Sequence, residues 1–315
     1  MAETELIALA ERLGSRPFVV FAALALLLIL ALLITILVGR VAIHYARRIW
    51  QRAATAWSRV ATQPVVQGLE RRFPIVWKVM RRLTATEYLV LHLILMLALA
   101  YAALGFISIA EAVTGEAAIV RVDLALANAL HSAATPSGIE FMRAFTFLGG
   151  GKALTVLSVA VLIVLLLRRH RILAVGWAVA VTGGALLNGA LKSIFERPRP
   201  SFADPIAVVA GWSFPSGHSM GTFIIVGMLA YVLFITIRSP TARLVLVAAA
   251  LVWIALMGFS RMYLGAHYLS DVVAGFAAGT VWLAGCVSGV EIARRRGGGR
   301  AHATVTPVPA STQIQ

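Results

Sequence analysis

The sequence predicts an all-α fold, a polytopic helical bundle that spans a membrane. Of its 315 residues, 60% are hydrophobic and only 13% are charged, and the mean hydropathy is +0.88. Soluble domains are more polar than this. The apolar residues form runs long enough to cross a hydrocarbon core of about 30 Å. The basic residues flank these runs and do not form a single stripe. A membrane protein with many spans accounts for all three observations.

Seven apolar runs are expected to form spans. The first is interpreted as a retained span and not as a signal peptide, because Glu3, Glu5 and Glu11 precede it and because it is too long for a signal-peptide core. Two short basic turns, at 168–171 and 238–243, separate neighbouring runs. The expected spans lie near residues 17–39, 88–110, 152–167, 172–191, 217–237, 244–260 and 268–290.

Lysine and arginine are distributed unequally between alternate loops, and the richer side is expected to face the cytoplasm. That side holds 19 of the 28 basic residues, in 40–87, the two basic turns and the tail from Arg294. We therefore expect the N-terminus outside the cell and the C-terminus in the cytoplasm. The net charge of +15 reflects this bias, so nucleic acid is not an expected partner.

Two segments on the cytoplasmic side lie outside the apolar runs. Residues 40–87 carry two amphipathic patterns with basic faces, which are typical of a segment that lies on a membrane surface. Residues 291–315 are polar, basic and contain proline, and we expect a disordered tail.

Local patterns make two further predictions. Ser137 to Glu140 resemble a capping box that opens a short helix in the outer loop 111–150. The last span contains two Gly-x-x-x-Gly pairs, which allow helices to approach closely and are expected to pack inside the bundle. These pairs are Gly275 with Gly279 and Gly285 with Gly289.

Three short polar segments stand at the ends of apolar runs, where a charge needs a partner. They supply three cations, a Ser-Gly pair, two imidazoles and one carboxylate, and the predicted topology places all of them on the outer face. This set suits a phosphate ester, whose charge is stabilised by cations and N–H groups. The residues are Lys192, Arg199, Ser216, Gly217, His218, Arg261, His267 and Asp271.

Part of this set is suited to bind a phosphate group. Lys192, Arg199 and Arg261 supply positive charge, the two arginines through forked hydrogen bonds. Ser216 and Gly217 are expected to begin a helix whose N-terminal N–H groups attract an anion. Ser216 either caps this helix or binds a phosphate oxygen directly.

The other part is suited to covalent chemistry. His267 and Asp271 are four residues apart, so a helix that starts near residue 267 places them on one face. The carboxylate can then accept from Nδ1 and direct Nε2 at phosphorus, while His218 protonates the leaving oxygen. No acidic cluster has metal-ligand spacing, and neither a metal nor another cofactor is expected. With Cys286 as the single cysteine, a disulfide framework and a thiolate metal site are excluded.

The three segments resemble the signature motifs of the type 2 phosphatidic acid phosphatase superfamily. The matching residues are Lys192-x6-Arg199-Pro200, Pro215-Ser216-Gly217-His218 and Ser260-Arg261-x5-His267-x3-Asp271. The spacing from Lys192 selects Arg199, so Arg197 is interpreted as a solvated charge. The resemblance implies a six-helix phosphatase core at 88–290. One extra N-terminal transmembrane helix and the basic loop, residues 1–87, precede this core.

The resemblance also implies metal-independent phosphatase chemistry, with His267 as nucleophile, His218 as acid and base, and Asp271 orienting His267. The remaining residues of the set surround the phosphate. We expect a lipid phosphatase of a bacterial inner membrane that acts on the periplasmic side. Undecaprenyl diphosphate, phosphatidic acid and phosphatidylglycerophosphate all fit as substrates. Two alternatives stay open, a lipid phosphotransferase and a non-catalytic lipid transporter or scaffold. The sequence does not predict an oligomeric state.

Overall fold

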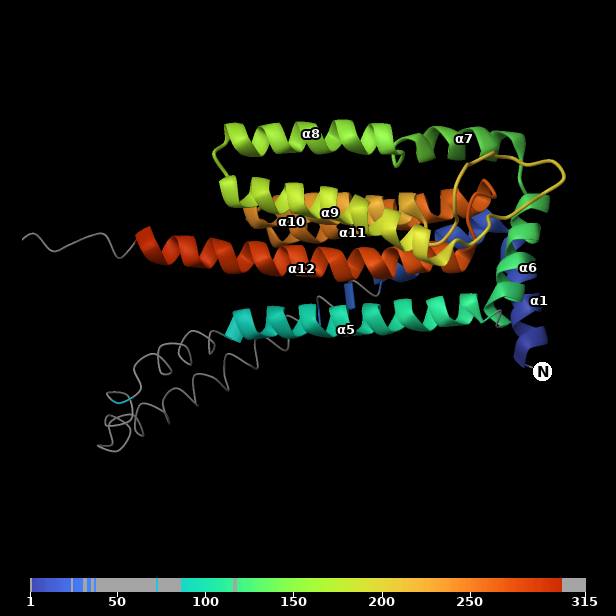
Figure 1. Cartoon of the computed structure of the whole chain (residues 1–315), viewed down its shortest axis with the longest axis horizontal. Coiled ribbons are helices and arrows are strands. Elements are labelled where there is room, and N and C mark those ends of the chain that lie inside the picture. Colours follow the sequence, from blue (N-terminus) through green and yellow to red (C-terminus); the bar gives the residue numbers. More distant parts are fainter. Residues whose placement is uncertain are drawn as a thin grey trace, which may run out of the picture.

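The structure is a computed structural model that describes residues 2–23, 25–30, 33–34, 37, 72, 86–115 and 118–301. Every regular element in this part of the chain is a helix, which confirms the predicted all-α fold. The helices named in Figure 1 are α1 (Ala2–Gly14), α5 (Thr86–Thr114), α6 (Ala118–Ser132), α7 (Pro136–Phe147), α8 (Gly151–Leu167), α9 (Arg171–Phe195), α10 (Gly217–Thr236), α11 (Pro240–Tyr263) and α12 (Leu269–Ala301).

The long helices lie nearly parallel, and α1 and α6 cross them at one end of the bundle (Figure 1). Helix α12 packs against α5, α9, α10 and α11 and so occupies the middle of the bundle. The main core cluster forms between α9 and α10, where Trp177, Ile224 and Met228 are almost fully buried. Burial of such large side chains fixes the relative positions of these helices and therefore of the residues at their ends.

The membrane-spanning character predicted from composition is confirmed. Five helices are long and apolar enough to cross a membrane, and up to seven spans result if each of two bent helix pairs counts as one. The bent pairs join Glu3–Gly14 to Pro17–Leu30 at 99° and Leu99–Thr114 to Ala118–Ser132 at 85°. The five other spans are Pro136–Leu167, which contains α7 and α8, Arg171–Phe195, Gly217–Thr236, Pro240–Tyr263 and Leu269–Arg295.

The short helix in the outer loop begins differently from the prediction. Thr135, and not Ser137, is the N-cap of α7, and its hydroxyl accepts from the backbone N–H of Gly138 at 3.2 Å. Pro136 follows at the first helical position, where its fixed φ and missing N–H favour a helix start. The crossing helix α6 was not predicted. The amphipathic patterns of 40–87, Arg72 excepted, and the tail beyond Ala301 lie outside the described residues, and the division of the chain at 87 and 290 stays a prediction.

The two Gly-x-x-x-Gly pairs of α12 have different surroundings. A Cβ atom on Gly275 would lie 2.9 Å from the backbone oxygen of Ser216, and one on Gly279 would lie 3.2 Å from Phe223, so this pair packs inside the bundle as predicted. For Gly285 and Gly289 the prediction is wrong, because no described atom outside the backbone of α12 itself lies within 4 Å of the same position.

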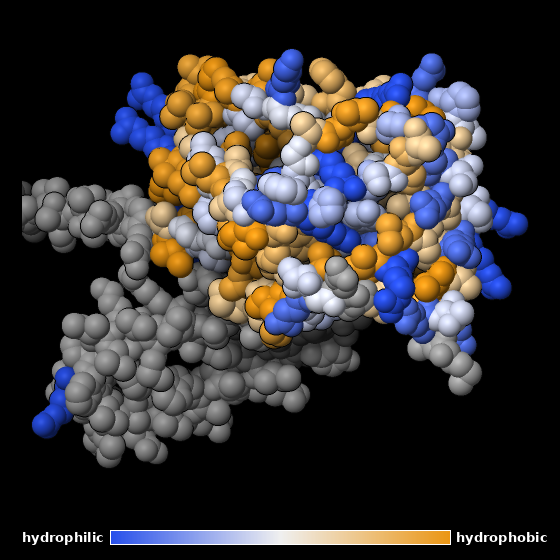
Figure 2. Space-filling model, turned by 45° about the vertical axis from the view of Figure 1, so that its right-hand side comes forward, coloured by the Kyte–Doolittle hydropathy of each residue, from blue (hydrophilic) through white to orange (hydrophobic). Residues whose placement is uncertain are grey.

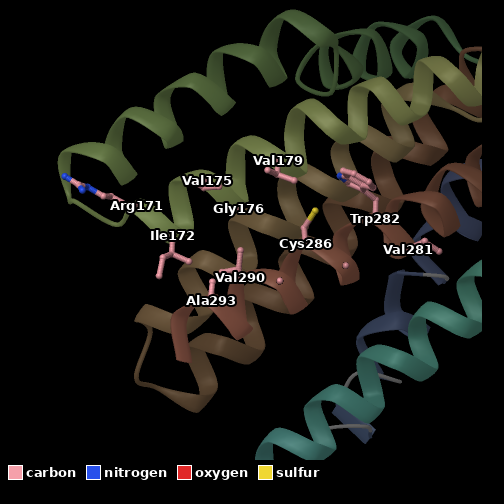
Figure 3. A pocket seen from close by; sticks show the side chains of 12 residues that line it. Arg171, Ile172, Val175, Gly176, Val179, Val281, Trp282, Cys286, Val290 and Ala293 are labelled. Atoms are coloured by element: carbon pink, nitrogen blue, oxygen red, sulfur yellow. The ribbon is translucent and has the colours of Figure 1, made fainter. Parts of the chain in front are cut away.

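These two glycines instead line an open groove between α9 and α12. The groove has a volume of about 640 Å³ and nearly apolar walls, with Arg171 at one end (Figure 3). Cys286 and Trp282 also line it. This groove lies toward the start of α9, whereas the predicted site residues lie at the other end of that helix.

Candidate functional site

The eight predicted site residues lie at one end of the bundle, the end that α6 crosses (Figure 1). Helices α9 and α11 finish there, and α10 and α12 begin there. Figure 2 shows hydrophilic side chains gathered across this end and hydrophobic side chains along the flank. The residues are Lys192 in α9, Arg199 in the loop after it, Ser216, Gly217 and His218 at the start of α10, Arg261 in α11, and His267 and Asp271 at the start of α12.

The structure brings the three motifs within interaction distance of one another. His218 of the second motif interacts electrostatically with Lys192 and Arg199 of the first motif and with Arg261 and His267 of the third. Gly217 lies beside the first motif, because a Cβ atom there would lie 3.8 Å from Cε of Lys192. Residues that are far apart in the sequence therefore form a single site.

His267 precedes α12 instead of belonging to it. Asp271 occupies the third position of the helix and accepts from the backbone N–H of Tyr268 at 2.9 Å. This contact is half of a capping box and starts the helix at Leu269, two residues later than predicted. Nδ1 of His267 nevertheless lies 3.4 Å from Oδ2 of Asp271.

The contacts of His267 define which ring nitrogen carries the proton. Nε2 lies 3.0 Å from Nη1 of Arg199. A guanidinium only donates hydrogen bonds, so Nε2 is the acceptor and the proton of the neutral ring lies on Nδ1. Nδ1 faces both Asp271 and the hydroxyl of Ser213, the latter at 3.3 Å. Nε2 thus holds the lone pair on the side of the cations.

Burial also keeps His267 neutral. The side chain is only 3% exposed, and this burial lowers the pKa of His267 to about 4. Asp271 opposes the effect, whereas the charges of Arg199 and Arg261 add to it. At neutral pH the lone pair on Nε2 is therefore present in nearly every molecule.

Asp271 is fully buried and each of its carboxylate oxygens has a partner. Oδ1 accepts from Nη1 of Arg197 at 2.6 Å. Oδ2 accepts from the hydroxyl of Ser213 and from the backbone N–H of Tyr268. The backbone oxygen of Asp271 accepts from the N–H of Ser216 at 2.9 Å, which joins the start of α12 to the start of α10. The carboxylate therefore has a single fixed orientation.

Two of the predicted phosphate-binding cations are held by backbone carbonyl groups of the loops between α9 and α10 and between α11 and α12. Lys192 donates to the carbonyls of Trp212 and Ser213. Arg199 donates to the carbonyls of Gly211 and Ala266, both at 2.8 Å. Neutral carbonyls orient these cations but leave their charge uncompensated, so both retain a strong attraction for an anion.

Arg261 has unused hydrogen-bonding capacity. Its side chain is 5% exposed, and Nη1 donates to the hydroxyl of Thr146 at 2.9 Å. Nε is buried and has no partner among the described residues. A buried guanidinium donor without an acceptor is costly, and a phosphate oxygen is a strong acceptor for it.

Ser216 caps α10, which is one of the two roles left open by the sequence. Its hydroxyl oxygen accepts from the N–H of Ser219 at 3.4 Å and from the hydroxyl of Ser219 at 2.9 Å, and the side chain has no exposed surface. The first N–H groups of an α-helix have no partner within the helix and carry its positive dipole end. Gly217 and His218 follow the cap and occupy this end of α10.

Sequence reasoning missed the role of Arg197 in the site, and the interpretation of this residue as a solvated charge is wrong. The residue is 8% exposed. Glu196 adopts a left-handed conformation with a φ of 43° at the end of α9, and the chain turns there. The guanidinium of Arg197 then contacts Asp271 and Asp123 and lies 4.4 Å above the ring of Tyr268.

Three other contributing residues were also missed. Asp123 is the only carboxylate within α6, and an isolated buried carboxylate on an apolar helix is a signal that it has a partner. Ser213 and Thr146 carry no such signal, because single hydroxyl residues in loops and at helix ends are common.

A cavity of about 300 Å³ opens beside His218, between α8, α9 and α10. It extends two helical turns along these helices, to Ile225 and Ser158, and most of its lining is apolar. Asn188 and Gly217 lie at the end near the cations. Its volume is at the lower limit of about 300 Å³ for ligand pockets, so it has room for part of a lipid tail and not for a whole lipid.

Within the described residues, no group of three or more histidine, cysteine, aspartate or glutamate side chains is arranged to hold a metal ion. The absence of a metal from the reaction stays a prediction.

Comparisons with known proteins identify the family of this chain. The sequence pattern of the PAP2 superfamily matches residues 171–295, which include all eight predicted site residues. The chain is 41% identical over 96 residues to phosphatidylglycerophosphatase B of Bacillus subtilis, a match that covers 30% of this chain and 46% of that protein. It is 30% identical over 168 residues to the lipid A 4'-phosphatase of Bacteroides thetaiotaomicron, covering 48% of this chain and 68% of that protein. The chain thus spans about half the length of the first of these relatives.

A solved structure extends the comparison to the fold. The crystal structure of a transmembrane PAP2-type phosphatidylglycerolphosphate phosphatase from Bacillus subtilis matches with a TM-score of 0.58 and 29% identity. The match covers 62% of this chain and 96% of that one.

Proposed function

The chain belongs to the PAP2 superfamily, and from this membership we propose that it is a membrane lipid phosphatase. It hydrolyses a lipid phosphate or diphosphate without a metal, through a phosphohistidine on His267. The observation that carries the proposal is the 3.0 Å contact between Nε2 of His267 and Arg199. A buried neutral nucleophile there lies directly beside a cation that binds phosphate.

The reaction follows from this arrangement in two steps. When a phosphate enters, Arg199 transfers its hydrogen bond from Nε2 to a phosphate oxygen, while Arg261 and Lys192 neutralise the remaining charge. Nε2 of His267 attacks phosphorus and the bond from phosphorus to the leaving oxygen breaks, as His218 in its protonated form donates a proton to that oxygen.

The second step regenerates the enzyme. His218, now neutral, takes a proton from water, and the resulting oxygen attacks the phosphorus of the phosphohistidine. The nitrogen–phosphorus bond breaks, inorganic phosphate leaves, and His267 returns to its neutral form. In between, the ring of His267 carries a positive charge, which the carboxylate of Asp271 stabilises through Nδ1–H.

The cavity beside His218 supports a lipid as the substrate. Its apolar walls between α8, α9 and α10 are suited to the first part of a hydrocarbon tail. The site residues recognise phosphate and not the rest of the molecule. Phosphatidylglycerophosphate, phosphatidic acid, undecaprenyl diphosphate and a lipid A phosphate therefore all remain candidates, and the relatives favour the first and the last.

A substrate panel tests this function. We expect the purified protein to release inorganic phosphate from at least one of these four lipids, much faster than from glycerol phosphate, which has no tail. The rate should be unchanged by EDTA. Activity lost with EDTA and restored by Mg²⁺ would contradict the metal-free route. Transfer of the phosphate to an added lipid alcohol, with no free phosphate formed, would favour the phosphotransferase alternative.

We further propose that the site faces the periplasm of a bacterial inner membrane, with the C-terminus in the cytoplasm. Val208 in the loop between α9 and α10 is 89% exposed and is a suitable position for a reporter cysteine. In a Cys286→Ala background, Val208→Cys should react with a membrane-impermeant maleimide added to spheroplasts. The matched variant Arg168→Cys, at the opposite end of the bundle, should react only after lysis. The reverse pattern would overturn the proposed orientation.

A further inference from the structure

We propose that Arg197 and Asp123 are positioning residues that keep Asp271 ionised and His267 neutral before the attack on phosphorus. This inference rests on the proposed function. Neither Arg197 nor Asp123 is among the residues that the three motifs specify, since Arg197 occupies an unspecified position of the first motif. Both act through Asp271.

The guanidinium of Arg197 bridges two buried carboxylates. Nη1 donates to Oδ1 of Asp271 at 2.6 Å, and Nη2 donates to Oδ2 of Asp123 at 2.9 Å. Ser270 completes the network, because its backbone N–H donates to Oδ1 of Asp123 at 3.0 Å and its hydroxyl accepts from Nη1 of Arg197 at 2.7 Å. The exposed fractions are 0% for Asp271, 1% for Asp123 and 8% for Arg197.

In this network the two carboxylate oxygens of Asp271 have different partners. Oδ1 contacts Arg197, and Oδ2 lies next to Nδ1 of His267. A buried carboxylate needs a compensating cation. Arg197 supplies that cation at Oδ1, so the charge of Asp271 is compensated without protonation of His267.

Removal of Arg197 changes this balance. Two carboxylates would then be buried with no guanidinium between them, and the group best placed to compensate Asp271 would be the imidazole at 3.4 Å. A protonated His267 carries hydrogen on both nitrogens and has no lone pair with which to attack phosphorus. Burial alone would lower the pKa of Arg197, but the two carboxylates raise it above its ordinary value, so the guanidinium stays charged throughout the working pH range.

The other charged groups around His267 do not replace Arg197. Arg199 contacts Nε2, the ring nitrogen that is not next to Asp271, and Arg261 and His218 also interact electrostatically with the ring. A bound phosphate uses the charge of these groups. Within the described residues, Arg197 is the cation bound to Oδ1 of Asp271, and each of its terminal nitrogens contacts a carboxylate.

The test is the pH dependence of kcat/KM for the full chain and its variants on one lipid substrate. The substrate titrates identically in every assay, so differences between profiles report the enzyme. With the pKa of His267 at about 4, the activity of the wild type should not require a pH above the ordinary histidine value of about 6.5. The acid limb of the profile is the range over which activity falls as the pH decreases. Arg197→Gln should shift this limb to higher pH by at least about one unit.

Two further variants distinguish the effect of the charge of Arg197 from the effect of its shape. Arg197→Lys keeps the positive charge but loses the guanidinium group that bridges the two carboxylates. This variant should therefore keep the wild-type acid limb and have a lower maximum rate. Arg197→Gln combined with Asp123→Asn restores the net charge of the network, so its acid limb should return toward that of the wild type. A lower rate with an unmoved acid limb in Arg197→Gln would overturn the proposal, as would a further upward shift in the double variant.

Asp123→Asn decides the case if Arg197→Gln does not fold, as judged by size-exclusion chromatography. This variant keeps the shape of the side chain and lies away from the phosphate. Its kcat should fall about tenfold, because the cationic phosphohistidine loses a nearby negative charge, while its KM should stay within about twofold. An unchanged kcat or a raised KM would overturn the proposal. If the wild type releases no phosphate from any lipid, the proposed function itself fails, which is a distinct result.

Discussion

Replacement of His267 by alanine should abolish turnover, with a loss of at least about 10⁴-fold in kcat, because the group that forms the bond to phosphorus is removed. The lipid should still bind, since Lys192, Arg199 and Arg261 remain. Phosphate release in a single-turnover assay, together with equilibrium binding of the same lipid, measures both effects.

A matched substitution controls for general damage. His170 is an exposed histidine at the start of α9, at the far end of the bundle from the site, and its side chain makes no capping hydrogen bond. His170→Ala should retain wild-type activity. Retained turnover in His267→Ala would contradict the covalent route and would favour direct attack by water. A lipid-transport activity that survives this substitution would favour the non-catalytic alternative.

Replacement of His218 by alanine should have the second largest effect, and its size should depend on the leaving group. For a lipid phosphate, whose alkoxide leaves poorly, the loss of the proton donor should slow the first step by about 10²–10⁴-fold. For p-nitrophenyl phosphate, whose leaving group needs no proton, this step should be much less affected. The second step still lacks its base, so the phosphoenzyme should accumulate.

The expected signature is a burst of nitrophenol followed by slow turnover, measured by stopped-flow absorbance. The amplitude of the burst should approach one equivalent per active site. Equal losses for the two substrates without a burst would mean that His218 only helps to bind the phosphate.

Much of the fold follows directly from the sequence because a membrane leaves a chain few options. An apolar run of sufficient length must satisfy its backbone internally, so it becomes a helix wherever it occurs. The start of α10 was predictable because Ser216 is a good cap and Gly217 follows it. Crossing helix α6 was not predictable from run length. It is short and carries Asp123 and Arg121, and its place depends on contacts with α1 and α12.

The site, like the fold, was only partly predictable from the sequence. The spacing from Lys192 distinguishes Arg199 from Arg197 but gives no account of what Arg197 does. Two arginines separated by a proline in a loop have no periodicity that indicates their direction. Arg197 contacts Asp123 and Asp271, and Arg199 contacts Ala266 and His267, all of which lie far away in sequence. The direction of each side chain is therefore a property of the assembled tertiary structure and not of the local pattern.

The glycines of α12 give a second example. Gly275 and Gly285 occur in the same pattern, yet one meets the backbone of α10 and the other faces an open groove. The Gly-x-x-x-Gly pattern indicates that a neighbouring helix is able to pack closely against α12. It does not indicate which face of α12 the neighbouring helix covers, because that depends on the crossing geometry of the whole bundle.

The central claim is that a nitrogen of this chain forms a covalent bond to the phosphorus of a lipid phosphate. Rapid quenching of the wild-type protein with ³²P-labelled lipid, at alkaline pH where phosphohistidine is stable, followed by peptide mass spectrometry, tests it most directly. We expect one labelled site, at His267, that forms and decays at rates compatible with turnover. Label on a different residue, or rapid phosphate release from a protein that never acquires label, would contradict the mechanism.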